Sequence, residues 1–330
     1  MNSIVERAPM QFREFLKKLR LPVIQAPMLR VSGPEMVIAA CRAGIIGSFP
    51  APNARTLEIL GDWYAQISQV SKAEGVPWAA NVIVHPSNPR LEGDLAQVYK
   101  HKPPIVITAL GSPKEVIDSV HAYGGYVLAD VASPRHARKA VDAGADGLVL
   151  LCSGAGGYTG SLSPFAFIEE VRGFFDGPVV LAGAINSGRS IRAAQVAGAD
   201  LAYMGTGFIA TDESMAKAEY KEMIVESVAD DTWTSDAITG APVCWLKPSL
   251  VKQGLDPKTL VKSAEFDFSK QTEGKRRWTD IWSAGHAVGA STAVVPLACV
   301  VDRLETEYRA VLQLERQQLD ALATADSDPA

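Results

Sequence analysis

Three apolar runs between residues 147 and 208 contain or lead into glycine-rich segments. GLVLLCS (147–153) continues into SGAGGYTG (153–160), PVVLAGA (178–184) continues into INSG, and the last run contains MGTG (204–207). Without a Cβ, glycine lets backbone N–H groups approach a ligand closely, and a phosphate is the ligand typical of such turns. The alternative is that these glycines only permit tight turns. The expected phosphate donors are Gly183, Ala184, Gly205 and Thr206, with the Thr206 hydroxyl as a further donor.

Eight apolar runs that end in turn residues must position these segments. Each run is followed by a segment of helical period, as in Ser133-Pro134 before RHARKAVDAG, which supplies an N-cap, a proline at N1 and a closing Gly144. Continuous apolar runs are typical of parallel strands covered by helices on both faces. Eight strand–helix units predict an α/β fold, a closed (β/α)8 TIM barrel with a C-terminal lid or subdomain insertion. The runs are residues 22–28, 45–50, 78–84, 104–111, 125–131, 147–153, 178–184 and 201–208.

The pattern divides the chain into four parts. We expect the barrel, with the ligand site at the carboxyl ends of its strands, in residues 1–210. Residues 211–290, rich in Asp, Thr, Pro and Lys, are interpreted as a lid or substrate subdomain. We expect residues 291–322 to form a helix packed on the barrel and residues 323–330 to form a disordered tail.

Composition and charge exclude several classes of protein. The 330 residues carry 32 Lys and Arg against 37 Asp and Glu, with no basic concentration typical of nucleic-acid binding. No signal-peptide core is visible, and the longest apolar stretches are too short to span a membrane. The widely spaced cysteines favour neither a metal site nor disulfides. We therefore expect a soluble cytoplasmic protein with a small-molecule substrate, no nucleic-acid or membrane partner and no metal; the assembly, a homodimer or otherwise, is left open.

A dinucleotide-binding interpretation of GAGGYTG is weak. The glycine spacing does not fit, no suitably placed acid ends the next strand, and the segment lies in the middle of the chain.

Four segments in order resemble the nitronate monooxygenase family, formerly called 2-nitropropane dioxygenases. These are IQAPM in the first run, AGGYTG after the sixth, AGAI in the seventh and GADLAYMGTGFIAT around the eighth. The family consists of FMN-containing TIM barrels related to flavin-dependent enoyl-ACP reductases. The resemblance extends from PVIQAPM to about WSAGHAVG and implies FMN as the cofactor.

The resemblance also implies roles for individual residues. Main-chain atoms of Ala26, Pro27 and Met28 would lie against the flavin ring, and Asn81 would bond its edge. Gly156 and Gly157 would contact the cofactor from the strand-six loop. Asp130 stands beside the cofactor, where relatives often carry Lys, Thr or Ser. The phosphate would be held by Ala182, Gly183, Ala184, Gly205 and Thr206, which agrees with the donors expected from the glycine pattern.

Two candidate catalytic residues follow from a departure from the family pattern. Many relatives carry histidine in AGGHxG, where it acts as the catalytic base or as an electrostatic partner of the substrate, whereas this chain has Tyr158. A phenol is mainly a neutral hydrogen-bond donor at neutral pH, so Tyr158 suits a preformed nitronate or a substrate carbonyl; the alternative is a loop residue without a role. His286, in WSAGHAVG, would enter the pocket from the opposite side and supply a titratable group; the alternative is a surface or lid-packing histidine.

Side chains of the 211–290 segment leave two interpretations open. Its aromatic residues either build an apolar substrate pocket or form a small core, and its basic residues either attract an anionic carrier such as a CoA thioester or are simply solvated. The aromatic residues are Trp233, Trp245, Phe266, Phe268, Trp278 and Trp282. The basic residues are Lys247, Lys252, Lys258, Lys262, Lys270, Lys275, Arg276 and Arg277.

The resemblance implies an FMN-dependent oxidoreductase that oxidises alkyl nitronates with O2 via reduced flavin. The alternative enzyme is a flavin-dependent reductase or dehydrogenase that acts on an enoyl or acyl thioester with NAD(P)H, which Tyr158 and the basic residues would suit. A third hypothesis, a non-catalytic phosphate-ligand-binding or cofactor-storage barrel, predicts a colourless protein or a flavin that no substrate turns over.

Overall fold

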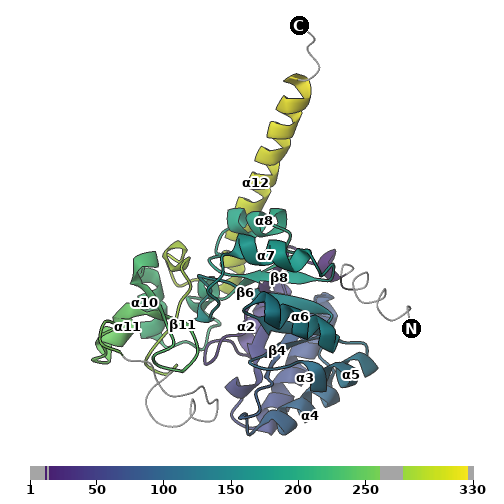
Figure 1. The fold of residues 1–330 in the computed structure, drawn as a ribbon, viewed down its shortest axis with the longest axis vertical. Helices are drawn as coiled ribbons and strands as arrows, with labels where there is room; N and C mark the ends of the chain where they lie inside the picture. The colour runs from purple at the N-terminus through teal and green to yellow at the C-terminus, as the bar shows by residue number, and fades with distance from the viewer. Residues whose placement is uncertain (1–11, 13–14, 261–277, 326–330) are drawn as a thin grey trace.

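A parallel barrel forms the body of the protein (Figure 1). The computed structural model describes residue 12 and residues 15–260 and 278–325. Backbone hydrogen bonds from Gln25 N to Ile46 O (2.8 Å) and from Ile46 N to Val23 O (3.1 Å) join the first strand to the start of the second. The strands follow the order β1-β9-β8-β6-β5-β4-β3-β2 around the barrel. They are β1 (Val23–Gln25), β2 (Gly47–Pro50), β3 (Trp78–Ile83), β4 (Ile105–Ala109), β5 (Tyr126–Val131), β6 (Gly147–Leu151), β8 (Val179–Ala182) and β9 (Leu201–Met204). Each lies within one predicted run, so the TIM barrel is confirmed.

Helices follow the barrel strands, and local capping residues set their ends. The Ser133 side chain accepts from His136 N, the Ser187 side chain accepts from Ser190 N, and Gly144 adopts the left-handed conformation. The eighth predicted run is shortened because the chain turns into a helix after Gly205. The elements are α2 (Pro34–Arg42), η1 (Ala51–Asn53), α3 (Leu57–Glu74), α4 (Leu91–His101), α5 (Lys114–Ala122), α6 (Pro134–Ala143), α7 (Pro164–Arg172), α8 (Gly188–Val196) and α9 (Thr206–Ile209).

Strand β3 shows why continuous apolar runs form this fold. All six of its residues are buried. Trp78, Ala80 and Val82 pack into the core between strands and helices, whereas Ala79 belongs to the core inside the barrel. Because side chains alternate along a strand, Asn81 faces the same side as Ala79, toward the barrel interior. A strand buried on both faces cannot show the polar alternation of a surface strand.

The post-barrel segment (residues 211–290) adds a second, smaller sheet. Its strands β10 (Thr232–Ser235) and β11 (Val243–Leu246) pair with β7 (Gly157–Tyr158), which belongs to the loop after β6. This antiparallel pairing attaches the post-barrel segment to the barrel loop that carries Tyr158. The remaining elements are α10 (Ala218–Glu226), η2 (Ala229–Asp231), α11 (Lys247–Lys252) and η4 (Val288–Ala290). Phe266, Phe268, Lys262, Lys270, Lys275, Arg276 and Arg277 lie outside the described residues.

The C-terminal helix α12 (Leu297–Ala325) packs against α8 near its start and projects away from the body beyond it (Figure 1). Two predicted boundaries are corrected. The helix starts at Leu297, directly after Pro296, rather than at residue 291. It also continues through residues 323–325, because alanine and leucine sustain it, so this part of the predicted tail is helical; residues 326–330 lie outside the described range.

In the described part of the chain, no helix combines the length and apolarity needed to cross a bilayer. Within the same residues, no group of three His, Cys, Asp or Glu side chains is placed to hold a metal ion. Cys41, Cys152 and Cys244 are buried thiols, and Cys299 is an exposed one.

We predict that Gly188→Ala lowers the free energy of unfolding by about 2–3 kcal/mol, because α8 and α12 touch there through backbone atoms. A Cβ at Gly188 would collide with the backbone N of Tyr308 and lie 2.5 Å from Leu304 O. Urea unfolding measures the effect. The control Arg189→Ala, one position along at an exposed site, should shift stability by less than about 0.5 kcal/mol. Equal stability of the two variants would contradict this account of the contact.

Candidate functional site

A cavity of about 720 Å³ lies at the carboxyl ends of the barrel strands, between the barrel and the post-barrel segment. Backbone and side chains from β1, β3, β5, the β6 loop, β8 and β9 form its barrel side. Pro242, Trp278, Ile281 and Trp282 contribute from the post-barrel segment. The predicted residues that line it are Ala26, Pro27, Met28, Asn81, Asp130, Gly156, Gly157, Tyr158, Ala182, Gly183, Ala184, Gly205 and Thr206. The sequence therefore located the site, although contact of these residues with a cofactor stays a prediction.

Buried polar side chains fix the loop Ala26–Met28 that follows β1. Asn53 Nδ2 donates to Met28 O (2.9 Å) and to Ser32 O (2.7 Å), and Met28 N donates to the Ser32 hydroxyl (2.7 Å). The buried Gln25 amide donates to Ala26 O. Sequence analysis missed Gln25, Ser32 and Asn53, which give this main chain a rigid position at the cavity wall.

The loops after β6, β8 and β9 meet the chain around Gly285. Gly154 O accepts from Ala184 N (3.2 Å) and from His286 N (3.0 Å). Gly285 N donates to the Thr206 hydroxyl oxygen (2.9 Å). The Ala184 amide thus donates to Gly154 O in this structure, and its role as a phosphate donor stays a prediction. The Thr206 hydroxyl accepts here, which leaves its hydrogen for a ligand.

Glycines at this junction are needed for close backbone approach. A Cβ at Gly156 would lie 2.7 Å from Gly285 N, and a Cβ at Gly285 would lie 2.6 Å from Gly154 O. At Gly157, by contrast, an added Cβ would meet nothing within 4 Å. Gly156 and Gly285 thus pack backbone on backbone, and Gly157 leaves open space beside the cavity, while the approach of a phosphate to these glycines stays a prediction.

Strained backbone gathers around the same cavity. Leu110, Ala184 and Trp278 line it and have φ values of 61°, 54° and 62°. Non-glycine residues in this left-handed region are costly, and such residues cluster at ligand sites. The observation supports a binding function for this cavity.

Asp130 and Tyr203 line the cavity, and each has a polar atom buried behind the cavity wall. Asp130 Oδ1 and Tyr203 OH are buried without a hydrogen-bond partner among the described residues. Burial raises the pKa of Asp130 to about 8, and it raises the pKa of Tyr203, to which the nearby Asp130 also contributes. Asp130 is therefore mostly protonated at neutral pH and presents a neutral donor to the cavity. Asn81 uses one amide hydrogen for Ile107 O (3.2 Å) and keeps further hydrogen-bonding capacity.

Tyr158 is held on the cavity wall by the small sheet. It pairs with Val243 of β11, and its ring centroid lies 5.8 Å from that of Trp278. Trp278 in turn lies 5.0 Å from Trp245, which is buried in a small core of the post-barrel segment. The aromatic residues thus serve both predicted purposes, because Trp245 forms core while Trp278 and Trp282 line the cavity.

The structure does not bring His286 into the cavity, so its predicted catalytic role is not supported. Gly285 and Ala287 line the cavity, but the His286 side chain is exposed. Its amide is bound to Gly154 O, and its ring lies over Gly154. A different histidine, His136 of α6, lies on the cavity wall, where it is exposed. Burial raises the pKa of Cys152, which ends the sixth run, to about 12, so this thiol packs as a neutral side chain.

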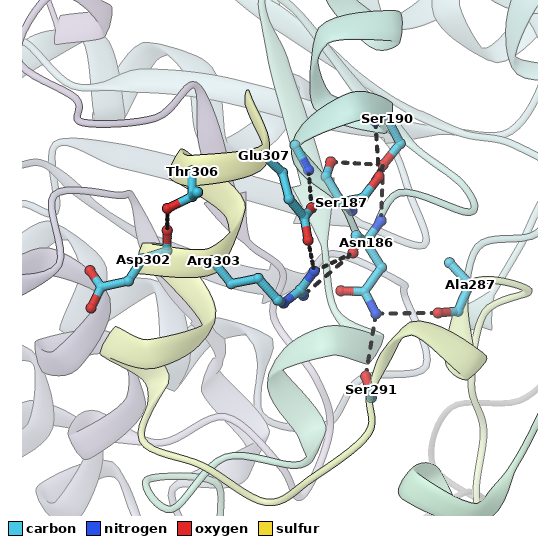
Figure 2. A network of polar contacts seen from close by, with 10 residues as sticks. Asn186, Ser187, Ser190, Ala287, Ser291, Asp302, Arg303, Thr306 and Glu307 are labelled. Atoms are coloured by element: carbon cyan, nitrogen blue, oxygen red, sulfur yellow. Dashed lines mark hydrogen bonds and ion pairs between the residues drawn. The ribbon is translucent and has the colours of Figure 1, made fainter. Parts of the chain in front are cut away.

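A polar network joins the β8 loop to α12 and to the chain after Gly285 (Figure 2). Asn186 Nδ2 donates to Ala287 O (3.2 Å) and to the Ser291 hydroxyl (3.3 Å). Arg303 donates to Asn186 O (3.4 Å) and pairs with Glu307 at 2.8 Å. The network fixes the loop that carries Gly183 and Ala184. Asn186 belongs to the segment after the seventh run. Its partners lie about 100 residues further along the chain, so local spacing could not predict these contacts.

The chain is similar to several known proteins. Residues 90–273, more than half of the chain, match the family model described as nitronate monooxygenase. A nitronate monooxygenase of Paraburkholderia phytofirmans is 28% identical over 90% of this chain and 94% of that protein. A (3aS,4S,5R,7aS)-5-hydroxy-7a-methyl-1-oxo-octahydro-1H-indene-4-carboxyl-CoA dehydrogenase of Rhodococcus jostii is 28% identical over 70% of this chain, and the match spans 64% of its own length.

A solved structure supports the fold independently. FabK from Thermotoga maritima superposes with a TM-score of 0.78 over 93% of this chain and 98% of that chain, at 24% sequence identity. At this identity the likeness supports the barrel and its post-barrel segment but not a shared activity.

We predict that Asp130→Asn removes a pH-dependent loss of stability. The carboxyl has a raised pKa in the folded protein, so above about pH 4 the unfolded chain releases a proton that the folded chain keeps until about pH 8. Its contribution therefore falls as pH rises through this window. Between pH 5 and 8 the unfolding free energy of Asp130→Asn should gain up to about 4 kcal/mol relative to the parent protein.

Urea unfolding at unit pH steps tests this, with the exposed Asp118→Asn on α5 as the matched control. A difference between parent and Asp130→Asn that stays constant from pH 5 to pH 8 would show that the folded state does not hold this proton.

Proposed function

This chain belongs to the nitronate monooxygenase family, and on that premise we propose that it is an FMN-dependent oxidoreductase that oxidises alkyl nitronates with O2. The observation that carries the proposal is the gathering of every predicted cofactor-binding residue around one cavity at the strand ends. An oxidoreductase is the class to which the family and its named relatives point. The cofactor, the substrate and the electron acceptor are the proposed parts.

The residues around the cavity suit a flavin nucleotide. The main chain of Ala26–Met28 offers a rigid wall for a flat ring, and Asn81 and Asp130 offer polar groups for a ring edge. The amides of Gly183 and Gly205, together with the Thr206 hydroxyl, suit a phosphate. When bound, FMN would take electrons from the organic substrate and pass them to the acceptor.

Tyr158 and the aromatic residues would hold the substrate. Trp278, Ile281 and Trp282 make the post-barrel side of the cavity apolar, which suits an alkyl chain and excludes water. The Tyr158 phenol would donate a hydrogen bond to a nitronate oxygen. A nitronate has already lost its proton, so no basic side chain is needed at position 158.

A second candidate is a flavin-dependent reductase or dehydrogenase of an acyl thioester. The CoA dehydrogenase relative and the phenol at position 158 favour it, because a donor to a thioester carbonyl oxygen would polarise that group. Lys139 and His136 on the α6 side of the cavity would suit an anionic carrier. Of the basic post-barrel residues, Lys247 already donates to Asp230 O, and Lys252 lies over the Trp282 ring.

Anaerobic mixing separates the two candidates. The FMN-loaded protein is mixed in separate runs with propyl-2-nitronate, with 2-nitropropane, with NADH or NADPH, and with an acyl-CoA. The proposal expects the nitronate to bleach the flavin absorbance, with recovery on admission of O2, and the neutral nitroalkane to react at least about tenfold more slowly. Bleaching by NAD(P)H or acyl-CoA alone would favour the second candidate, and a flavin that none of them reduces would contradict both.

We predict that Tyr158→Phe lowers kcat/KM for the nitronate by about 10- to 100-fold, because the variant loses one hydrogen-bond donor to the developing charge. The ring and its contact with Trp278 remain, so the FMN dissociation constant should change by less than about threefold. Steady-state kinetics and a flavin titration measure the two quantities. Tyr123→Phe, whose hydroxyl donates to Pro103 O away from the cavity, is the control. Unchanged kcat/KM in Tyr158→Phe would remove the phenol from the reaction.

A further inference from the structure

We propose that two asparagines outside the cavity wall position the two ends of the flavin site separately. Asn186 positions the end that takes the phosphate, and Asn53 positions the end that takes the ring. The inference rests on the proposed function and deepens it, because it assigns each end of the cofactor a residue of its own. Neither side chain lines the cavity, so both act through the main chain that they hold.

Asn186 joins four segments of the chain at one buried position (Figure 2). Its Nδ2 donates to Ala287 O (3.2 Å) and to the Ser291 hydroxyl (3.3 Å). Its backbone N donates to the Ser190 hydroxyl (3.2 Å), and its carbonyl oxygen accepts from Arg303 (3.4 Å). One residue thus connects the loop after β8 to α8, to α12 and to the chain that returns from the post-barrel segment.

These contacts lead to the predicted phosphate donors on two strands. Gly183 belongs to the same loop as Asn186. The returning chain held by Nδ2 also contains Gly285, whose N donates to the Thr206 hydroxyl oxygen (2.9 Å). The Asn186 Oδ1 atom lies against Gly207 of α9, where an added Cβ would collide with it. Without this side chain, the main chain at Gly183 and the Thr206 hydroxyl would both lose support.

Asn53 has the corresponding place beside the loop after β1. It ends η1 and makes three hydrogen bonds to that loop. Nδ2 donates to Met28 O (2.9 Å) and to Ser32 O (2.7 Å), while Oδ1 accepts from Arg30 N (2.7 Å). Arg30 has a φ of 61°, which is costly for a residue with a side chain, so these bonds hold a turn that would otherwise relax. Met28 and Pro27 of this loop line the cavity where the ring is expected.

The hydrogen bonds of the two asparagines share no partner in the described part of the chain. Substitutions at sites without shared partners normally act independently. A loop that has lost its support must be ordered by the ligand, and this cost reduces affinity. We therefore expect each asparagine to affect the affinity for one end of the cofactor.

Flavin binding tests the proposal without any assay of turnover. FMN and riboflavin are titrated into the apoprotein with quenching of flavin fluorescence as the signal. Riboflavin lacks the phosphate, so the ratio of the two dissociation constants reports on the phosphate end alone. Asn186→Ala should raise the dissociation constant of FMN by about 10-fold and that of riboflavin by less than about threefold. A general loss of stability would weaken both ligands alike and leave the ratio unchanged.

Asn53→Ala is the matched control, because it makes the same change at the other end of the site. It should raise both dissociation constants by a similar factor of about 10, and it should shift the visible absorption maxima of bound riboflavin, which depend on the surroundings of the ring. Asn186→Ala should leave these maxima in place. If either variant folds poorly, Arg303→Met and Ser32→Ala each remove one partner at the same end and should show the same pattern at about threefold size.

Three outcomes count against the proposal. Equal weakening of FMN and riboflavin in Asn186→Ala overturns it, because the effect is then not confined to the phosphate end. Parent riboflavin affinity and an unshifted spectrum in Asn53→Ala also overturn it. Failure of the parent protein to bind FMN overturns the proposed function and this inference with it, whereas tight FMN binding that neither substitution changes overturns this inference alone.

Discussion

The carbonyl of Gly154 is the contact on which the rest of the site depends. It accepts amide hydrogens from Ala184 and His286, and so it joins the loop after β6 to the loop after β8 and to the chain that returns from the post-barrel segment. These segments can meet only because Gly156 and Gly285 lack side chains at the contact. Three strand ends and the returning chain thereby share one rigid junction made of backbone. Rigid backbone donors are what a phosphate site requires, since they are already oriented before the ligand arrives.

The two sides of the cavity differ in polarity. Asn81, Asp130 and Tyr203 are polar residues of its barrel side, whereas Trp278 and Trp282 make the opposite side apolar. A flat heterocycle with polar edges and an alkyl substrate needs both kinds of surface. Burial of Asp130 within the barrel raises its pKa, because a charged carboxylate is disfavoured where it is removed from water.

The small sheet explains how the post-barrel segment becomes part of the site. β7 contributes only Gly157 and Tyr158, yet its pairing with β11 fixes the phenol at the cavity wall. The segment therefore cannot be treated as an independent domain, because its edge strand belongs to a barrel loop. Family membership and the superposed barrel of FabK agree with this architecture.

The sequence alone determined the barrel and the place of the site. Strands that are buried on both faces appear in the sequence as continuous apolar runs. Ser133, Ser187 and Gly144 are capping residues that mark helix ends. The carboxyl ends of the strands of a barrel lie on one face, which gives the place of the site. Only the tertiary structure decided which groups in that place are available. The Ala184 amide donates to Gly154 O, the His286 side chain is exposed, and Asp130 contributes to the raised pKa of Tyr203 from another strand. Each of these depends on a contact between residues far apart in the chain and on the direction of a side chain or amide, which local spacing does not specify.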